Sequence, residues 1–181
     1  PSLRGQIFGC VLEIKVKKIS YVRVVTRTQG FWQTHTEFTS NIFQSKAGGS
    51  MNIGTPAHLR VVTNDAGNGN SRLFGAYYSS ISRKTNNSLR LALDSARMKL
   101  LSQLISAKLN CAAFGCSSQT QTLISNADEA YATGPVSLIN SYNTQLDDYN
   151  NSGDSYDIPP ELLPVGSATP AQSNSRANKI F

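Results

Sequence analysis

Apolar side chains recur at helical spacing over residues 87–115, the strongest structural pattern in the chain. They form two adjacent rows, with positions three or four residues apart: Leu93, Ala96, Leu100, Leu104, Ala107 and Cys111 in one, and Leu101, Ile105, Leu109 and Ala112 in the other. Two such rows make an apolar face wide enough to cover a globular core. Proline is absent from the segment, and Gly115 is suited to end a helix. We therefore expect one long amphipathic helix, around which the other elements pack.

A second pattern, with period two, occupies residues 10–27. Apolar residues take even positions and mainly charged residues take odd ones; the apolar positions are Leu12, Ile14, Val16, Val22 and Val24. This alternation predicts a half-buried β-strand. Eighteen residues far exceed the usual strand length of about five or six. The segment is therefore either two strands with a kink in the chain's own sheet, or one extended arm that pairs with another chain.

Shorter patterns predict the remaining elements. Helical spacing of apolar residues favours helices over residues 73–84, 122–131 and 136–150, and residues 59–62 favour a short strand. Residues 158–181 contain four prolines and little periodicity, which is typical of an extended tail. The sequence thus predicts an α+β protein: a strand or arm over residues 1–27, a mainly helical domain over 28–157 around the long helix, and a Pro-rich tail over 158–181.

Composition and charge favour an extracellular protein. Only 15% of the residues are charged, and neutral polar residues are abundant, whereas a cytosolic enzyme more often carries many Glu and Lys. No run of 18 apolar residues is present, so we expect no membrane span. The chain starts at Pro1, which fits a removed leader or a fragment boundary equally well.

The net charge of +6 is unevenly distributed along the chain. Residues 1–35 are basic, whereas residues 126–161 contain carboxylates and no Lys or Arg. The basic residues are not interleaved with stacking aromatics, so we do not expect nucleic-acid binding. Opposite charges of this kind can attract each other within one chain or between neighbouring copies.

Cys10, Cys111 and Cys116 leave one cysteine over, either free or paired between chains. A bond between Cys111 and Cys116 would close the end of the long helix, and a bond from Cys10 to either would tie the N-terminal segment to it. Too few further ligands stand nearby to predict a metal site.

Residues 28–35 read Thr-Gln-Gly-Phe-Trp-Gln-Thr-His, and residues 107–110 read Ala-Lys-Leu-Asn. Together they resemble a family of secreted bacterial proteins of unknown function, which carry a TQG-aromatic-W-x-x-H motif followed by a helix with AKLN. The resemblance covers about residues 28–150 and marks Gly30, Phe31, Trp32 and His35 as motif positions. The family often has Lys and Pro flanking the histidine, where this chain has Gln33 and Thr36. The resemblance implies an exported, extracellular setting, and nothing in it implies catalysis.

The candidate catalytic residues do not form a convincing site. His35 and Glu37 have the H-x-E spacing of zinc deaminases, but Cys111 and Cys116 lack the P-C-x-x-C spacing that completes it. Asp147 and Asp148 are adjacent on a predicted helix and point apart. We therefore expect no enzyme, no metal and no cofactor.

Two functions fit the sequence. The first is a self-assembling extracellular subunit of a surface filament or layer, whose strand and tail contact other copies through Leu12, Ile14, Val16, Val22, Val24, Ile180 and Phe181. The alternative is a secreted adhesion module that binds a glycan through exposed Trp32, Tyr77 and Tyr78. The expected partner is a second copy of the chain or a glycan.

Overall fold

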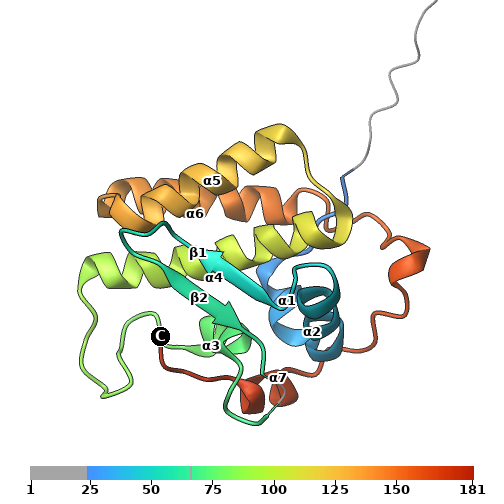
Figure 1. The fold of residues 1–181 in the computed structure, drawn as a ribbon, viewed down its shortest axis with the longest axis horizontal. Helices are drawn as coiled ribbons and strands as arrows, with labels where there is room; N and C mark the ends of the chain where they lie inside the picture. The colour runs from blue at the N-terminus through green and yellow to red at the C-terminus, as the bar shows by residue number, and fades with distance from the viewer. Residues whose placement is uncertain (1–23, 66) are drawn as a thin grey trace, which may run out of the picture.

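The computed structural model describes residues 24–65 and 67–181, which form seven α-helices and one two-stranded sheet (Figure 1). The mixed, mostly helical content fits the expected α+β class. In chain order the elements are α1 (Gln29–Thr34), α2 (Thr36–Ser45), β1 (Ser50–Ile53), β2 (Arg60–Thr63), α3 (Arg72–Tyr78), α4 (Ala92–Phe114), α5 (Ser118–Thr133), α6 (Val136–Asn151), the 3-10 helix η1 (Pro160–Leu162) and α7 (Pro170–Arg176).

Helix α4 lies in the middle of the structure, inside the segment predicted as a long helix. It begins at Ala92, five residues after the predicted start at Asn87, which instead has a positive φ of 64°. Residues 100–107 are all buried, including Ser102, Gln103 and Ser106. The expected amphipathic character is therefore wrong, because the polar side of this helix packs against other elements instead of facing solvent.

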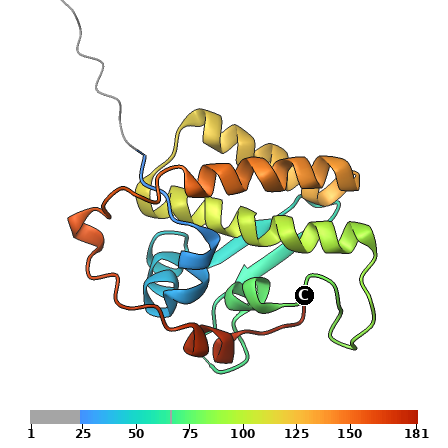
Figure 2. The ribbon, with the colours of Figure 1, turned by 180° about the vertical axis from the view of Figure 1, so that it is seen from behind.

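Two groups of elements cover α4 from different sides (Figures 1 and 2). Helices α5 and α6 pack on one side and on each other. The sheet, α3 and the short helices α1 and α2 cover the remainder. Strands β1 and β2 are antiparallel, with Met51 opposite Val62 and Ile53 opposite Arg60. Met51, Ile53 and Val62 are buried, so the sheet turns one face toward α4.

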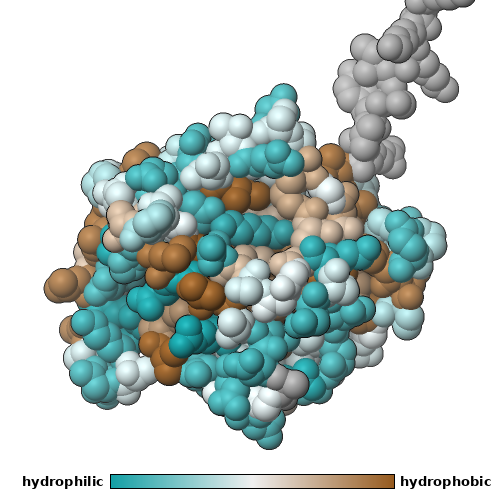
Figure 3. Space-filling model, viewed as in Figure 1, coloured by the Kyte–Doolittle hydropathy of each residue, from teal (hydrophilic) through white to brown (hydrophobic). Residues whose placement is uncertain are grey.

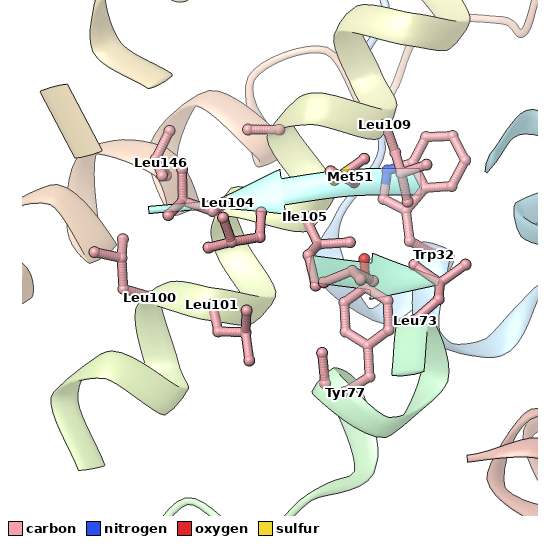
Figure 4. Close-up of a cluster of buried hydrophobic side chains, with 14 of the residues drawn as sticks. Trp32, Met51, Leu73, Tyr77, Leu100, Leu101, Leu104, Ile105, Leu109 and Leu146 are labelled. Atoms are coloured by element: carbon pink, nitrogen blue, oxygen red, sulfur yellow. The ribbon is translucent and has the colours of Figure 1, made fainter. Parts of the chain in front are cut away.

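The hydrophobic core forms where these groups meet along α4 (Figure 4). Leu100, Leu101, Leu104 and Ile105 extend across the cluster, with Trp32 at one end. All five side chains are fully buried. Burying a side chain of this size contributes about 1.5–3 kcal/mol relative to leaving it exposed. The core of α4 thus supplies much of the stabilisation of the fold.

Several segments differ from the sequence predictions. Residues 24–27 are irregular and belong to no strand, because the backbone N–H and carbonyl of Arg27 bond to the side chain of Asn110 and the hydroxyl of Thr26 accepts from the N–H of Gly153. Residues 1–23, with Cys10, Leu12, Ile14, Val16 and Val22, lie outside the described residues. No sequence pattern predicted helices α1 and α2 or strand β1, which is only four residues long.

The C-terminal tail is extended only in part, because residues 170–176 form α7. The tail lies along its own domain: Asn178 donates its N–H to the carbonyl of Ser71 at 2.8 Å, and Ser71 donates to the carbonyl of Arg176 at 2.9 Å. Gly75 on α3 permits this approach, since a Cβ there would stand 1.9 Å from the carbonyl oxygen of Asn178. The end of the tail is therefore paired with the start of α3 in its own domain.

A disulfide joins Cys111 and Cys116, whose Cα atoms are 4.8 Å apart. This is the local pairing among those that the sequence left open. It closes the connection in which Gly115 ends α4 and Ser117 caps α5. Helices α4 and α5 are thereby joined covalently at one end.

No helix among the described residues is long and apolar enough to span a membrane.

We predict that Cys116→Ser lowers the free energy of unfolding by about 2 kcal/mol, because opening this short loop frees the unfolded chain. Urea unfolding of the oxidised protein and of the variant measures the difference. Reductant should destabilise the wild-type protein to the same extent and leave the variant unchanged. Equal stability of oxidised and reduced wild-type protein would contradict the prediction.

Candidate functional site

The two sequence motifs meet at the side chain of Asn110, the last residue of the AKLN segment. Its Oδ1 accepts hydrogen bonds from the backbone N–H of Arg27 at 2.7 Å and from Nε1 of Trp32 at 3.2 Å. Its Nδ2 donates to the carbonyl of Arg27 and to Oδ1 of Asn150, both at 2.9 Å. Asn110, Trp32 and Asn150 are fully buried. The motif residues thus form one structural unit.

This buried network continues through Asn150 to the polar side of α4. Asn150 donates to the carbonyl and to Oε1 of Gln103, at 3.1 and 2.7 Å. Gln103 in turn donates to Oε1 of Gln29 at 3.2 Å and to Oδ1 of Asp147 at 2.9 Å. Satisfied hydrogen bonds in a low-dielectric interior fix one packing arrangement. The amides at its centre cannot act as an acid, a base or a nucleophile, so the network positions α1, α4 and α6.

Arg27 fastens the start of the described chain to the segment after α6. Its guanidinium donates to the carbonyls of Thr26, Asp154 and Tyr156, at 2.7, 3.0 and 2.7 Å. Burial lowers the pKa of Arg27, and the charges of Asp154 and Asp157 partly oppose this shift. Every bond named here is to a main-chain oxygen, so this arginine holds backbone in place.

Gly153 lets the two segments approach each other. Its N–H donates to Oγ1 of Thr26 at 2.8 Å. A Cβ at position 153 would stand 2.1 Å from the carbonyl oxygen of Val24, closer than any real contact. The glycine is therefore required by this contact.

His35 packs on Phe31, with ring centroids 4.0 Å apart and its Nδ1 3.0 Å from the carbonyl oxygen of Phe31. Glu37 faces a different partner and forms an ion pair with Arg176 at 2.6 Å. Gly30, the remaining motif position, is exposed in α1. In the described part of the chain, no three His, Cys, Asp or Glu side chains are grouped as metal ligands would be.

The aromatic residues expected to bind a glycan are not available for stacking. Trp32 is fully buried, and Tyr77 is buried with its hydroxyl 3.0 Å from Oγ of Ser106. Burial raises the pKa of Tyr77. Tyr78 is half-buried, and its hydroxyl lies 2.8 Å from Oγ of Ser173. The prediction of three exposed stacking groups is therefore wrong, because these rings fill the core and anchor α7.

Lys108, the second residue of the AKLN segment, also has a structural role. Its Nζ lies 2.6 Å from Oδ2 of Asp128 and 2.6 Å from the carbonyl oxygen of Asn52. Asp128 accepts a further hydrogen bond, at 2.8 Å, from the N–H of Gly54. The pair links β1 to α4 and α5 along the outer edge of the sheet.

A hollow of about 270 Å³ lies between the start of α4, the β1–β2 connection and the C-terminal residues. Its lining is basic: Arg60, Lys84, Arg90 and Arg97, with Asp94 as the acidic residue. His58 and Tyr131 also line it. We name this hollow the basic pocket.

The basic pocket affects the titration of its own side chains. Burial lowers the pKa of His58, and the positive charges of Arg97 and Arg60 lower it further. Burial raises the pKa of Tyr131, whose hydroxyl accepts a hydrogen bond from Nε of Arg60 at 3.2 Å. These shifts favour the neutral imidazole of His58 and the neutral hydroxyl of Tyr131.

Few residues predicted to contact other copies fall on the described surface. Val24 and Ile180 are exposed, at 36% and 53%. Phe181 is buried at 5% exposure, and the Arg60 guanidinium lies over its ring at 5.4 Å. Phe181 therefore does not offer a free contact surface.

Comparison with known proteins gives no match: no family model, no curated protein and no solved structure is similar to this chain.

Sequence reasoning missed both the buried network and the basic pocket. Gln103 and Asn110 have helical spacing from each other on α4, and this polar row was the available signal for the network. The pocket residues come from segments distant in sequence, so no local pattern marks them.

We predict that Asn110→Ala lowers the free energy of unfolding by about 3 kcal/mol or more. It leaves buried donors and acceptors of Arg27, Trp32 and Asn150 without partners, and each such group costs about 1–3 kcal/mol. Guanidinium unfolding followed by fluorescence of Trp32, the chain's one tryptophan, measures the change.

Asn140→Ala, on the exposed side of α6, is the matched control and should change stability by less than about 0.5 kcal/mol. A loss at Asn110 no greater than that of this control would show that the network does not stabilise the fold.

Proposed function

We propose that this chain is an extracellular structural protein whose copies associate head to tail into a filament or layer. The observation that carries the proposal is the separation of charge across the domain. Residues 118–151, which comprise α5, α6 and the link between them, contain four carboxylates and no Lys or Arg. Residues 60–99, which include β2, α3 and the start of α4, contain seven Lys and Arg against two carboxylates. We name these the acidic side and the basic side.

The two sides lie on different parts of the molecule. Helices α5 and α6 flank α4 on one side, whereas α3 and the connection from α3 to α4 lie on the other (Figures 1 and 2). Glu129 and Asp148 are exposed on the acidic side, and Arg72 and Arg83 are exposed on the basic side. Complementary charge accelerates encounter and selects the orientation of a complex.

Contacts between two different surfaces build an open chain of copies. The acidic side of one copy contacts the basic side of the next, and each copy keeps one free side of each kind. Such heterologous contacts continue indefinitely unless a rotation closes them into a ring. A filament or layer is the natural product.

Exposed apolar side chains occur on both sides. Leu89 and Leu91, at 70% and 72% exposure, lie in the connection before α4, and Leu138 lies on α6 at 42%. On the face seen in Figure 3, hydrophobic residues likewise occur in separate patches among hydrophilic ones. Burying such residues gives a contact strength that charge alone does not. The strand or arm predicted over residues 10–27, of which residues 10–23 lie outside the described part of the chain, is proposed to pair with a neighbouring copy.

Three features support the proposed extracellular setting. A disulfide between Cys111 and Cys116 is typical of oxidising compartments. The low charged fraction and the resemblance of residues 28–35 and 107–110 to exported proteins favour the same setting. The buried motif residues fit a structural role without catalysis.

We predict that the protein associates at low salt and dissociates as salt is raised, because exposed charges are screened. Sedimentation velocity over a concentration series at low and high salt measures this. Two double variants test the orientation: Glu129→Lys with Asp148→Lys blocks the acidic side, and Arg72→Glu with Arg83→Glu blocks the basic side. Each variant alone should remain monomeric.

An equimolar mixture of the two double variants should associate again, because the intact basic side of one faces the intact acidic side of the other and the two reversed sides are also complementary in charge. Lys46→Glu, which reverses an exposed charge just after α2 and outside both sides, is the control and should still assemble. A wild-type protein that stays monomeric at every concentration and at low salt would overturn the proposal.

A further inference from the structure

Three arginines of the basic pocket are held by oxygen atoms of the fold. Arg97 donates from Nε to the carbonyl of Tyr131 and from a terminal nitrogen to the carbonyl of Ala132, both at 2.8 Å. Arg60 donates from Nε to the hydroxyl of Tyr131. Arg90 donates from Nε to the carbonyl of Ser80 at 3.0 Å and from a terminal nitrogen to the carbonyl of Phe181.

These bonds leave part of each guanidinium group unused. A guanidinium carries five N–H donors in a fixed plane. The bonds named above use at most two donors of each arginine. The side chains are thus fixed in place while donors remain for another partner. Donors ordered in advance lose little conformational entropy when a ligand binds.

Charge in the basic pocket is unbalanced. Four cationic side chains line it together with the carboxylate of Asp94. Over residues 24–65 and 67–181, none of these five groups forms an ion pair within 4.0 Å. Burial lowers the pKa of His58, and the field of Arg97 and Arg60 lowers it further against the opposing charge of Asp94.

We propose that the basic pocket binds a tetrahedral oxyanion, sulfate or phosphate, either as the free ion or as a terminal ester. The arginines reach the pocket from three directions: from β2, from the α3–α4 connection and from α4. They therefore suit a tetrahedral ion, whose oxygens also point in several directions. A planar carboxylate is satisfied by one bidentate guanidinium. A divalent anion also neutralises more of the excess charge. The volume of about 270 Å³ accommodates such a group with a small attached residue.

This inference goes beyond the proposed assembly and does not depend on it. Variants at Arg72 and Arg83 test assembly, and neither residue lines the basic pocket. The two proposals can therefore fail separately.

Isothermal titration calorimetry and the NMR signals of the His58 ring test the proposal, at protein concentrations where the chain is monomeric. Sodium sulfate and sodium phosphate are titrated against sodium acetate, with ionic strength held constant by sodium chloride. We expect saturable binding of sulfate or phosphate, together with a rise in the pKa of His58. The pKa rises because a bound anion offsets the positive field of Arg60, Arg97 and Lys84 and adds to the negative field of Asp94.

Four single variants test whether each charge of the pocket changes sulfate binding in the expected direction. Arg60→Gln and Lys84→Gln should each weaken sulfate binding by about fivefold or more, because each removes a charge from the lining. Asp94→Asn should strengthen binding by about fivefold, because it removes the competing carboxylate. Lys99→Gln, on the exposed side of α4 and outside the pocket, is the matched control and should have less than a twofold effect.

Glucose 6-sulfate distinguishes the source of the anion. Its binding to the same site supports an ester ligand, whereas binding of inorganic sulfate alone supports the free ion. Absence of saturable binding, equal binding of acetate, or weaker binding by the Asp94→Asn variant would overturn the proposal.

Discussion

The amide of Asn110 joins three parts of the chain that are distant in sequence: the residues before α1, the tryptophan within α1, and the end of α6. Because the site is fully buried, each of these polar groups must find its partner within the protein. The position of α1 on α4 therefore depends strongly on this side chain, whose two donors and whose oxygen are all used. In this chain the tryptophan of residues 28–35 bonds directly to the asparagine of residues 107–110.

The same packing decides which residues remain free for function. Trp32 and Tyr77 are buried in the core, and Lys108 is bonded to Asp128 and to the backbone of β1. Arg27 is committed to the backbone after α6. Among the groups that the fold leaves at the surface, the charges are unevenly placed, negative over α5 and α6 and positive near β2, α3 and the start of α4. The proposed assembly rests on the distribution of charge over the whole domain. The proposed oxyanion site rests on the charge of the basic pocket alone.

The sequence predicted elements more successfully than surfaces. The spacing of Leu100, Leu104 and their neighbours located α4, and the stripes around Ile124 and Leu146 located α5 and α6, because periodicity is a local property. Periodicity did not locate Ser102, Gln103 and Ser106 in the core, since polar residues are mostly exposed. Gln103 receives hydrogen-bond partners from α6 and Ser106 receives one from α3, while Ser102 bonds within α4 itself. Such partners depend on tertiary structure, which periodicity does not contain.

The basic pocket illustrates a different limit. Arg60, Arg90 and Arg97 lie far enough apart in sequence to read as ordinary solvated charges, and only the fold gathers them around one hollow. Like charges brought together oppose folding unless other interactions offset them. Here the carbonyls of Tyr131, Ala132 and Ser80 hold the guanidinium groups in position, and Asp94 offsets part of their charge. The oxyanion proposed above would offset the positive charge that Asp94 leaves unbalanced among the described residues of the pocket.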